Sequence, residues 1–182
     1  AFPHVTLWHL ASNDILLLGS EEPIPIEAKT LDAAFTDAVR KDLLRIRVPD
    51  AATLLSLQSH SDAGVRRIAG KGPVNRDLFP ILEYSAAIAL FLDRPSNLVE
   101  KTDMRLKGES ALDLGQVNYF GTRGFGPTRD EIAAMTQFHA RGKDGGPLYK
   151  KLLNHWAHRF PGDKEMQMRL RYGPWFQRID LK

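Results

Sequence analysis

The side chains best suited to chemistry in this sequence lie between Pro73 and Tyr84, where the chain reads Pro-Val-Asn-Arg-Asp-Leu-Phe-Pro-Ile-Leu-Glu-Tyr. Polar and apolar residues follow neither the helical nor the strand period there, which predicts a packed loop held by its side chains. Asp77 and Glu83 are six residues apart, and two carboxylates that face one cavity can share a proton. The favoured interpretation is structural: Asp77 binds backbone amides and Glu83 pairs with a nearby arginine.

Histidines offer a second kind of site. His155 and His158 are three residues apart on a predicted helix and would bind a divalent metal if a carboxylate such as Asp163 joined them. No glutamate lies between them, so two partly exposed histidines are the favoured interpretation and no metal site is predicted. His60 and His139 are expected near helix C-termini, where the partial negative charge favours the imidazolium.

Phosphate binding and nucleophilic catalysis find little support. The segment 121–126 carries three glycines and an arginine ahead of a helix, but it lacks a preceding strand and the Gly-x-Gly-x-x-Gly spacing. A flexible loop is therefore favoured over residues 115–127. No Gly-x-Ser-x-Gly motif is present, and Ser12, Ser20 and Ser85 have no evident base beside them.

The elements that position these residues begin with a β-hairpin. Residues 3–10 are rich in β-formers, residues 14–20 form a second strand, and residues 11–13 form the turn. Ile15 to Leu18 are apolar without alternation, which predicts cover on both faces of that strand. Helices are expected beyond the linker 21–26, where capping residues and apolar spacing indicate them: 31–45, 51–60, a short basic helix from Asp62, 85–92, 97–107, 128–141, 147–160 and 164–172.

Two stretches give the chain a resemblance to a known family. Residues 75–84 match the Asn-Thr-Asp-Asp-Arg-Pro-x-Leu-Glu-Tyr motif of bacterial spermidine synthase-like (aminopropyltransferase-like) proteins, and residues 2–20 resemble the final strand pair of their Rossmann-like methyltransferase fold. Six residues of the first motif match in register: Asn75, Asp77, Pro80, Leu82, Glu83 and Tyr84. Arg76, Leu78 and Phe79 depart from it, so contacts made at those positions in relatives are not carried over.

The resemblance implies a fold class and a division of the chain. It predicts an α/β fragment that is mostly α-helical: a terminal antiparallel β-hairpin and helices of the Rossmann-like fold over residues 1–92, followed by a helical extension over residues 93–182. Asn75, Pro80 and Leu82 would be structural. Asp77, Glu83 and Tyr84 would wall the polyamine side of a site, since carboxylates and an aromatic ring suit a cationic amine.

The resemblance also implies an activity for a parent protein. Relatives transfer an aminopropyl group from decarboxylated S-adenosylmethionine, their co-substrate, to a polyamine. Their nucleotide-binding loop and catalytic aspartate precede the final strand pair, so this chain is expected to be a C-terminal fragment that is inactive alone and holds no cofactor. The expected partners are the upstream part of the same protein and a second copy that pairs through the hairpin. A cytoplasmic location is expected, with the parent membrane-tethered as in some relatives.

Composition and charge suggest an alternative function. The 182 residues are 43% hydrophobic and contain no cysteine, and no apolar run reaches the roughly 18 residues of a membrane helix. Residues 1–92 carry 9 Lys and Arg against 11 Asp and Glu, whereas residues 93–182 carry 16 against 11. The basic half alternates in sign among helix formers, so a solvated helical surface is favoured and no nucleic-acid binding is expected. The alternative function is a non-catalytic helical interaction module that docks a protein partner or an anionic surface.

Overall fold

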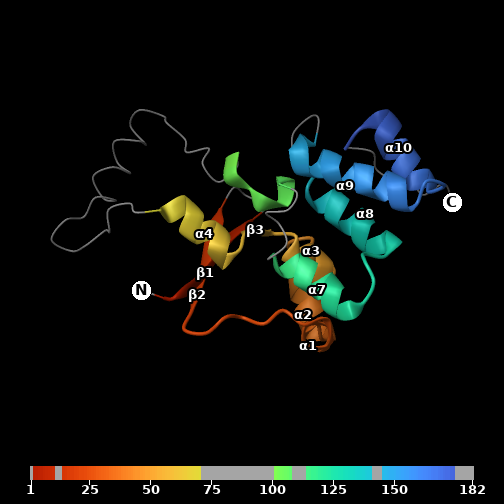
Figure 1. The fold of residues 1–182 in the computed structure, drawn as a ribbon. Coiled ribbons are helices and arrows are strands. Elements are labelled where there is room, and N and C mark those ends of the chain that lie inside the picture. The colour runs from red at the N-terminus through yellow and green to blue at the C-terminus, as the bar shows by residue number, and fades with distance from the viewer. Residues whose placement is uncertain (1, 11–13, 71–100, 108–113, 141–144, 175–182) are drawn as a thin grey trace.

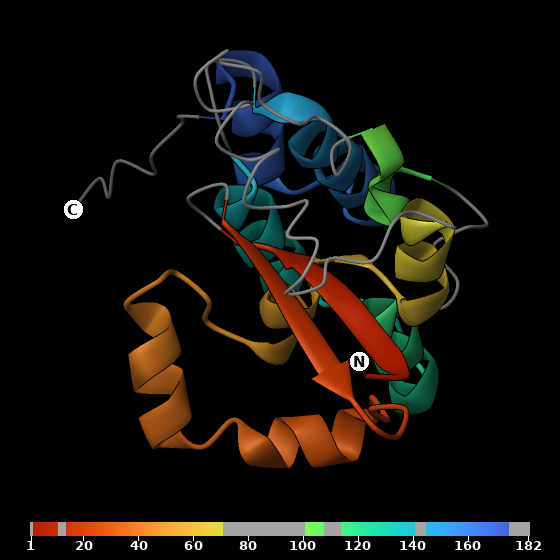
Figure 2. The ribbon, with the colours of Figure 1, turned by 90° about the vertical axis from the view of Figure 1, so that its left-hand side faces the viewer.

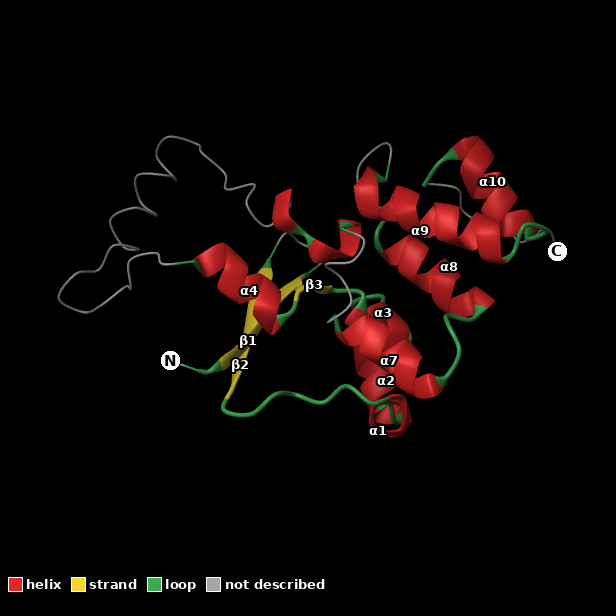
Figure 3. Cartoon of the chain, in the orientation of Figure 1, coloured by secondary structure: helices red, strands yellow, loops and turns green. Residues whose placement is uncertain are grey.

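The fold is mostly helical, with one small sheet at its side. A computed structural model describes residues 2–10, 14–70, 101–107, 114–140 and 145–174. In Figure 1 the sheet and α4 lie on one side, α8, α9 and α10 lie on the other, and Figure 3 colours the same view by secondary structure. The elements in chain order are β1 (His4–His9), β2 (Ile15–Ser20), α1 (Ala28–Ala34), α2 (Asp37–Leu44), α3 (Ala51–Leu55), β3 (Gln58–His60), α4 (Asp62–Ala69), the 3-10 turn η1 (Met104–Leu106), α7 (Gly115–Arg123), α8 (Arg129–Phe138), α9 (Gly146–Arg159) and α10 (Lys164–Tyr172).

The predicted hairpin is confirmed. β1 and β2 pair antiparallel with His4 opposite Ser20 and His9 opposite Ile15. The strand order is β2-β1-β3, so β1 is central and β2 is an edge strand. Figure 2 looks onto the side of the molecule where this pair lies. The prediction that residues 15–18 are covered on both faces is wrong for the described residues, because all four apolar side chains are exposed.

β3 is the element that local patterns did not predict. The predicted helix 51–60 ends at Leu55, and residues 58–60 instead pair antiparallel with β1 through an irregular register between Leu7 and Trp8. A strand of three residues is fixed by its partner rather than by its own propensity. The N-cap of α3 is confirmed, because the Asp50 carboxylate accepts the Thr53 N–H at 2.7 Å.

Two further predictions, a helix and a loop, are corrected by the structure. The predicted helix 31–45 is broken between α1 and α2, where Phe35 turns into the core and the Thr36 hydroxyl caps α2 by accepting the Val39 N–H. The predicted loop 115–127 contains α7. Gly115 lies at the start of α7 because a Cβ there would meet the Gln58 Oε1 at 2.8 Å, and Gly124 ends it in the left-handed conformation at φ 81°.

The last three helices follow the predictions more closely. The capping box at Thr128 is present, and α8 ends at Phe138 rather than near residue 141. α9 and α10 match the predicted ranges to within a residue at each end. The predicted helix 85–92 lies outside the described residues, as does the start of the predicted helix 97–107, and η1 occupies the last part of that second range.

One core joins residues from both predicted parts of the chain. Ala52 and Leu55 of α3 pack with Tyr119 of α7, Ile132 of α8 and Trp156 of α9, all of them buried. The predicted boundary at residues 92–93 lies outside the described residues and stays a prediction. In the described ranges no helix is both long and apolar enough to cross a lipid bilayer.

Candidate functional site

The predicted polyamine-facing motif lies outside the part of the chain that the structure describes. Asp77, Glu83 and Tyr84, with the structural positions Asn75, Pro80 and Leu82, all fall in the range 71–100. Their roles therefore stay predictions.

The most exposed apolar element that the structure describes is β2. Its side chains at positions 15 to 18 are exposed by 51%, 42%, 59% and 36% in chain order. The register places Leu17 opposite Leu7 and Leu16 opposite Trp8, so the exposed side chains lie on both faces of the sheet. Among described strands β2 pairs only with β1, which leaves its other edge open.

The central strand of this sheet, β1, is bound by α4 and β3. Asp62, the first residue of α4, accepts the Val5 N–H at 3.1 Å and lies 3.4 Å from the His4 Nδ1. The Val5 N–H and the guanidinium of Arg66 hold the pKa of Asp62 below its usual range. On the far edge of β1, the Ser59 hydroxyl donates to the Leu7 carbonyl oxygen. These contacts fix β1. β3, the other edge strand, is only three residues long and buried, so the exposed edge of the described sheet belongs to β2.

Within the described ranges, the open edge carries none of the usual protection against pairing. Natural edge strands are blunted by lysine, proline, bulges or a covering element. β2 reads Ile-Leu-Leu-Leu-Gly-Ser, and its ladder with β1 is regular throughout. The nearest charged residues, Asp14 and Glu21, lie just outside it. An edge of this composition is suited to pairing with a further strand.

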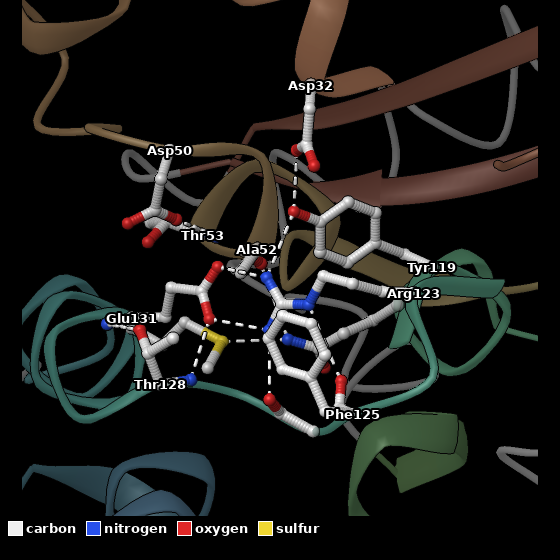
Figure 4. Close-up of polar contacts among 12 residues, drawn as sticks. Asp32, Asp50, Ala52, Thr53, Tyr119, Arg123, Phe125, Thr128 and Glu131 are labelled. Carbon is white, nitrogen blue, oxygen red and sulfur yellow. Dashed lines mark hydrogen bonds and ion pairs between the residues drawn. The ribbon is translucent and has the colours of Figure 1, made fainter. Parts of the chain in front are cut away.

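The densest polar cluster, drawn in Figure 4, joins three helices. Arg123 of α7 makes a two-pronged ion pair with Glu131 of α8, at 2.6 and 2.9 Å, and also donates to the hydroxyl of Tyr119. That hydroxyl donates to Asp32 of α1 at 2.7 Å. Glu131 further accepts the Thr128 N–H at 2.7 Å, closing the capping box.

This cluster is suited to holding the helices together. Burial and the hydrogen bond to the Asp32 carboxylate raise the pKa of Tyr119 far above its usual value, so the phenol stays protonated. Burial alone would raise the pKa of Glu131, but Arg123 and the Thr128 N–H outweigh it and hold it below its usual range. The Arg123 guanidinium also lies 4.3 Å from the centre of the Phe125 ring. Tyr119, Arg123 and Glu131 are thus bound to one another in their ordinary charge states.

Of the two buried histidines, His60 departs from its predicted position and His139 does not. His60 lies in β3, and burial lowers its pKa, which contradicts the expected imidazolium at a helix C-terminus. Its ring nitrogens lie 3.0 Å from the hydroxyls of Ser59 and Thr102. His139 does follow the C-terminus of α8, and its Nε2 lies 2.8 Å from the Ser56 Oγ.

The pair of Ser56 and His139 is a serine beside a possible base that sequence reasoning missed. The two residues are 83 positions apart and no local motif marks them. The Ser56 hydroxyl, however, donates to the Thr53 carbonyl oxygen at 2.7 Å. Its single proton is therefore committed to the backbone, and His139 donates to Ser56 rather than activating it.

The other candidate residues from the sequence do not come together in one site. His158 contacts the carbonyl oxygen of Asn154 at 2.8 Å, while burial and the cations around His155 lower the pKa of that ring. In the described ranges no group of three or more His, Asp or Glu side chains is arranged to hold a metal ion. Asp163 caps α10 and pairs with Arg129 at 2.6 Å. The glycine-rich segment 121–126 spans the end of α7 and the turn that follows it.

Comparisons of this chain with protein-family models, with curated proteins and with solved structures find no match.

Proposed function

We propose that the chain is a sheet-docking unit: the C-terminal part of a spermidine synthase-like protein, whose own sheet continues past β2. The observation that carries the proposal is the open, uncharged and regular edge of β2, with apolar side chains on both faces. A strand inside a larger sheet covered by helices has this composition. The residues that form the hairpin are also those that resemble the final strand pair of the family.

The identity of the docked strand follows from energetics. Burying one leucine or isoleucine side chain fully is worth about 1.5–3 kcal/mol, so covering four half-exposed ones gains roughly 4 kcal/mol per chain. Two copies pairing through β2 would gain about twice that, against an association cost of roughly 4–15 kcal/mol. A strand of the same polypeptide does not meet the full association cost, because its effective concentration is high. The proposed occupant is therefore a strand of the same protein, and a second copy is the weaker substitute.

In the proposed parent, aminopropyl transfer from decarboxylated S-adenosylmethionine to a polyamine would use groups that precede the hairpin. Asp77, Glu83 and Tyr84 are proposed to face the polyamine. Reading the coding sequence on the 5′ side of the Ala1 codon tests this part: a glycine-rich loop after a strand and an aspartate after a later strand are expected. Their absence would contradict an aminopropyltransferase parent.

The docking edge can be tested on the chain itself. We expect weak, concentration-dependent self-association in analytical ultracentrifugation, because β2 of one copy can pair with β2 of another. Leu17→Lys should abolish it. Leu170→Lys is the matched control, since Leu170 is exposed by 53% against 59% for Leu17 but lies on α10. Equal behaviour of the two variants would contradict docking through β2.

The alternative, an interaction module for an anionic surface, is less well supported. Several arginines of the basic half are paired internally: Arg105 with Asp103, Arg129 with Asp163, and Arg169 with Glu165. Arginines held in this way offer fewer free donors to phosphate groups or lipid headgroups. A protein partner of the helical face would remain compatible with these ion pairs.

A further inference from the structure

A pocket of about 230 Å³ lies among α7, α8, α9 and η1, away from β2. Its walls are mostly apolar, from Val117 and Phe120 of α7, Ile132 and Met135 of α8, and Leu152 of α9. Among the described residues that line it, none is acidic and three are basic. An apolar pocket with a few convergent polar groups is the usual form of a small-molecule site.

Of the three basic residues, Arg105 is neutralised. Its guanidinium donates to both carboxylate oxygens of Asp103, at 2.6 to 3.1 Å, and to the Ser56 carbonyl oxygen at 2.9 Å. The Arg105 and Asp103 side chains are exposed by only 8% and 7%, so this pair is a buried structural contact. Its role is to hold η1 against α3 at one side of the pocket.

Lys151 is the cation that remains available. Its ammonium group donates to the Arg105 carbonyl oxygen at 2.6 Å, which places it at the pocket. Toward the part of the chain that the structure describes, two of its three N–H donors make no further hydrogen bond. It forms no ion pair with any residue that the structure describes. An incoming anion would therefore meet a fixed positive charge without displacing a carboxylate.

His155 completes the lining one turn along α9 from Lys151. Burial and the nearby cations Arg159 and Lys151 keep the pKa of His155 below its usual value, so the ring is neutral near pH 7. A neutral imidazole supplies a hydrogen bond rather than a charge. Among the described lining residues, Lys151 is thus the charged recognition element of the pocket.

We propose that this pocket binds a small amphipathic carboxylate, with its apolar part between α7 and α8 and its carboxylate accepting hydrogen bonds from the Lys151 ammonium. The volume lies below the usual range of 300–1,000 Å³ for drug-sized ligands, which favours a chain of about eight carbons or a single aryl ring. The inference does not depend on β2, so it stands or fails separately from the proposed function.

Octanoate is the probe, with octan-1-ol and octylamine as isosteric controls that carry no charge and the opposite charge. Titrations of the full chain followed by ¹H–¹⁵N NMR should show saturable shifts for octanoate at residues lining the pocket. Octanoate should bind about two- to five-fold more tightly than octan-1-ol, the range expected for one partly exposed ionic contact. Octylamine should bind more weakly than either.

Lys151→Gln should lower octanoate affinity to that of octan-1-ol and leave octan-1-ol binding unchanged. Lys150→Gln is the matched control, because Lys150 is exposed on the same helix but does not line the pocket. Leu148→Trp, which fills the pocket, should abolish binding of octanoate and octan-1-ol. Equal affinity for all three probes, no saturable shift with octanoate, or equal effects of the two lysine variants would overturn the proposal.

Discussion

Replacing Glu131 by Gln tests the cluster that joins α1, α7 and α8. Gln preserves the capping box, because its amide oxygen can still accept the Thr128 N–H. It removes one of the two charged oxygens that the Arg123 guanidinium contacts at 2.6 and 2.9 Å. The variant therefore isolates the ion pair from the helix cap.

The expected loss follows from burial. The Arg123 and Glu131 side chains are exposed by only 11% and 14%, so Gln leaves a largely buried guanidinium without its counter-charge. Breaking a buried pair in this way costs about 3–5 kcal/mol, and residual solvent contact reduces the expected value to roughly 2–4 kcal/mol. For a domain of this size that corresponds to a fall in melting temperature of about 4–16 °C.

The assay is urea unfolding followed by circular dichroism near pH 7, with Asp130→Asn as the matched control. Asp130 occupies the same first turn of α8 and pairs with Arg129, but its side chain is exposed by 91%, so no measurable loss is expected.

The pH dependence of stability gives a second check on the role of Glu131. Because the folded pKa of Glu131 is lowered, its contribution is present above the ordinary glutamate value of about 4.5 and is lost as the pH falls through the folded pKa. The difference between wild type and Glu131→Gln should shrink over that window. Equal stabilities of the Glu131 and Asp130 variants near pH 7 would refute the reasoning.

Three further predictions concern the motif and the proposed partners. Asp77→Ala should cost about 1–3 kcal/mol if its carboxylate satisfies buried amides, and an unchanged thermal melt would mean that the side chain is exposed. Isothermal titration of the chain with decarboxylated S-adenosylmethionine should give no saturable heat, because the groups expected to hold it precede the hairpin in the family, and micromolar binding would refute this. Duplex DNA and anionic vesicles should bind weakly at physiological salt in fluorescence anisotropy and flotation assays, since several arginines of the basic half are paired internally; tight binding that weakens steeply with salt would favour the interaction module instead.

Features set by neighbouring residues could be predicted from the sequence. The cap at Asp50 and the capping box at Thr128 depend on backbone amides three residues away, and both are present. The hairpin also depends on local sequence, because two β-rich runs and the short turn between them are enough to predict it. The helices α9 and α10 follow from Pro147, the break at Pro161-Gly162 and their apolar spacing.

Features set by distant partners could not be predicted. β3 is a strand only because β1, about fifty residues earlier, offers its second edge. Gly115 begins a helix because the Gln58 side chain occupies the space beside it, and the Gly115 N–H donates to that side chain at 2.7 Å. The contact between Ser56 and His139 spans 83 positions. In each case the deciding partner lies outside the window that a local pattern can cover.

The element that covers β2 could not be identified from the sequence for a related reason. Four consecutive apolar residues at positions 15–18 are typical of a strand that is buried on both faces. Composition alone does not identify the element that covers it. The described helices pack on one another and against β1 and β3, and they leave β2 open. The mismatch between the apolar sequence and the exposed strand is the reason for assigning a docking role to this edge.

Amide hydrogen exchange measured across a concentration series tests the central claim, docking through the free edge of β2, most directly. Alternate amides of β2 donate to β1, so only those on the outer edge report on docking. These outer amides should exchange quickly in dilute solution and become protected as concentration rises, while β1 amides stay protected throughout. In Leu17→Lys the outer β2 amides should remain unprotected at every concentration. If they are equally protected at all concentrations in both proteins, the edge is already covered within a single chain and the docking role is contradicted.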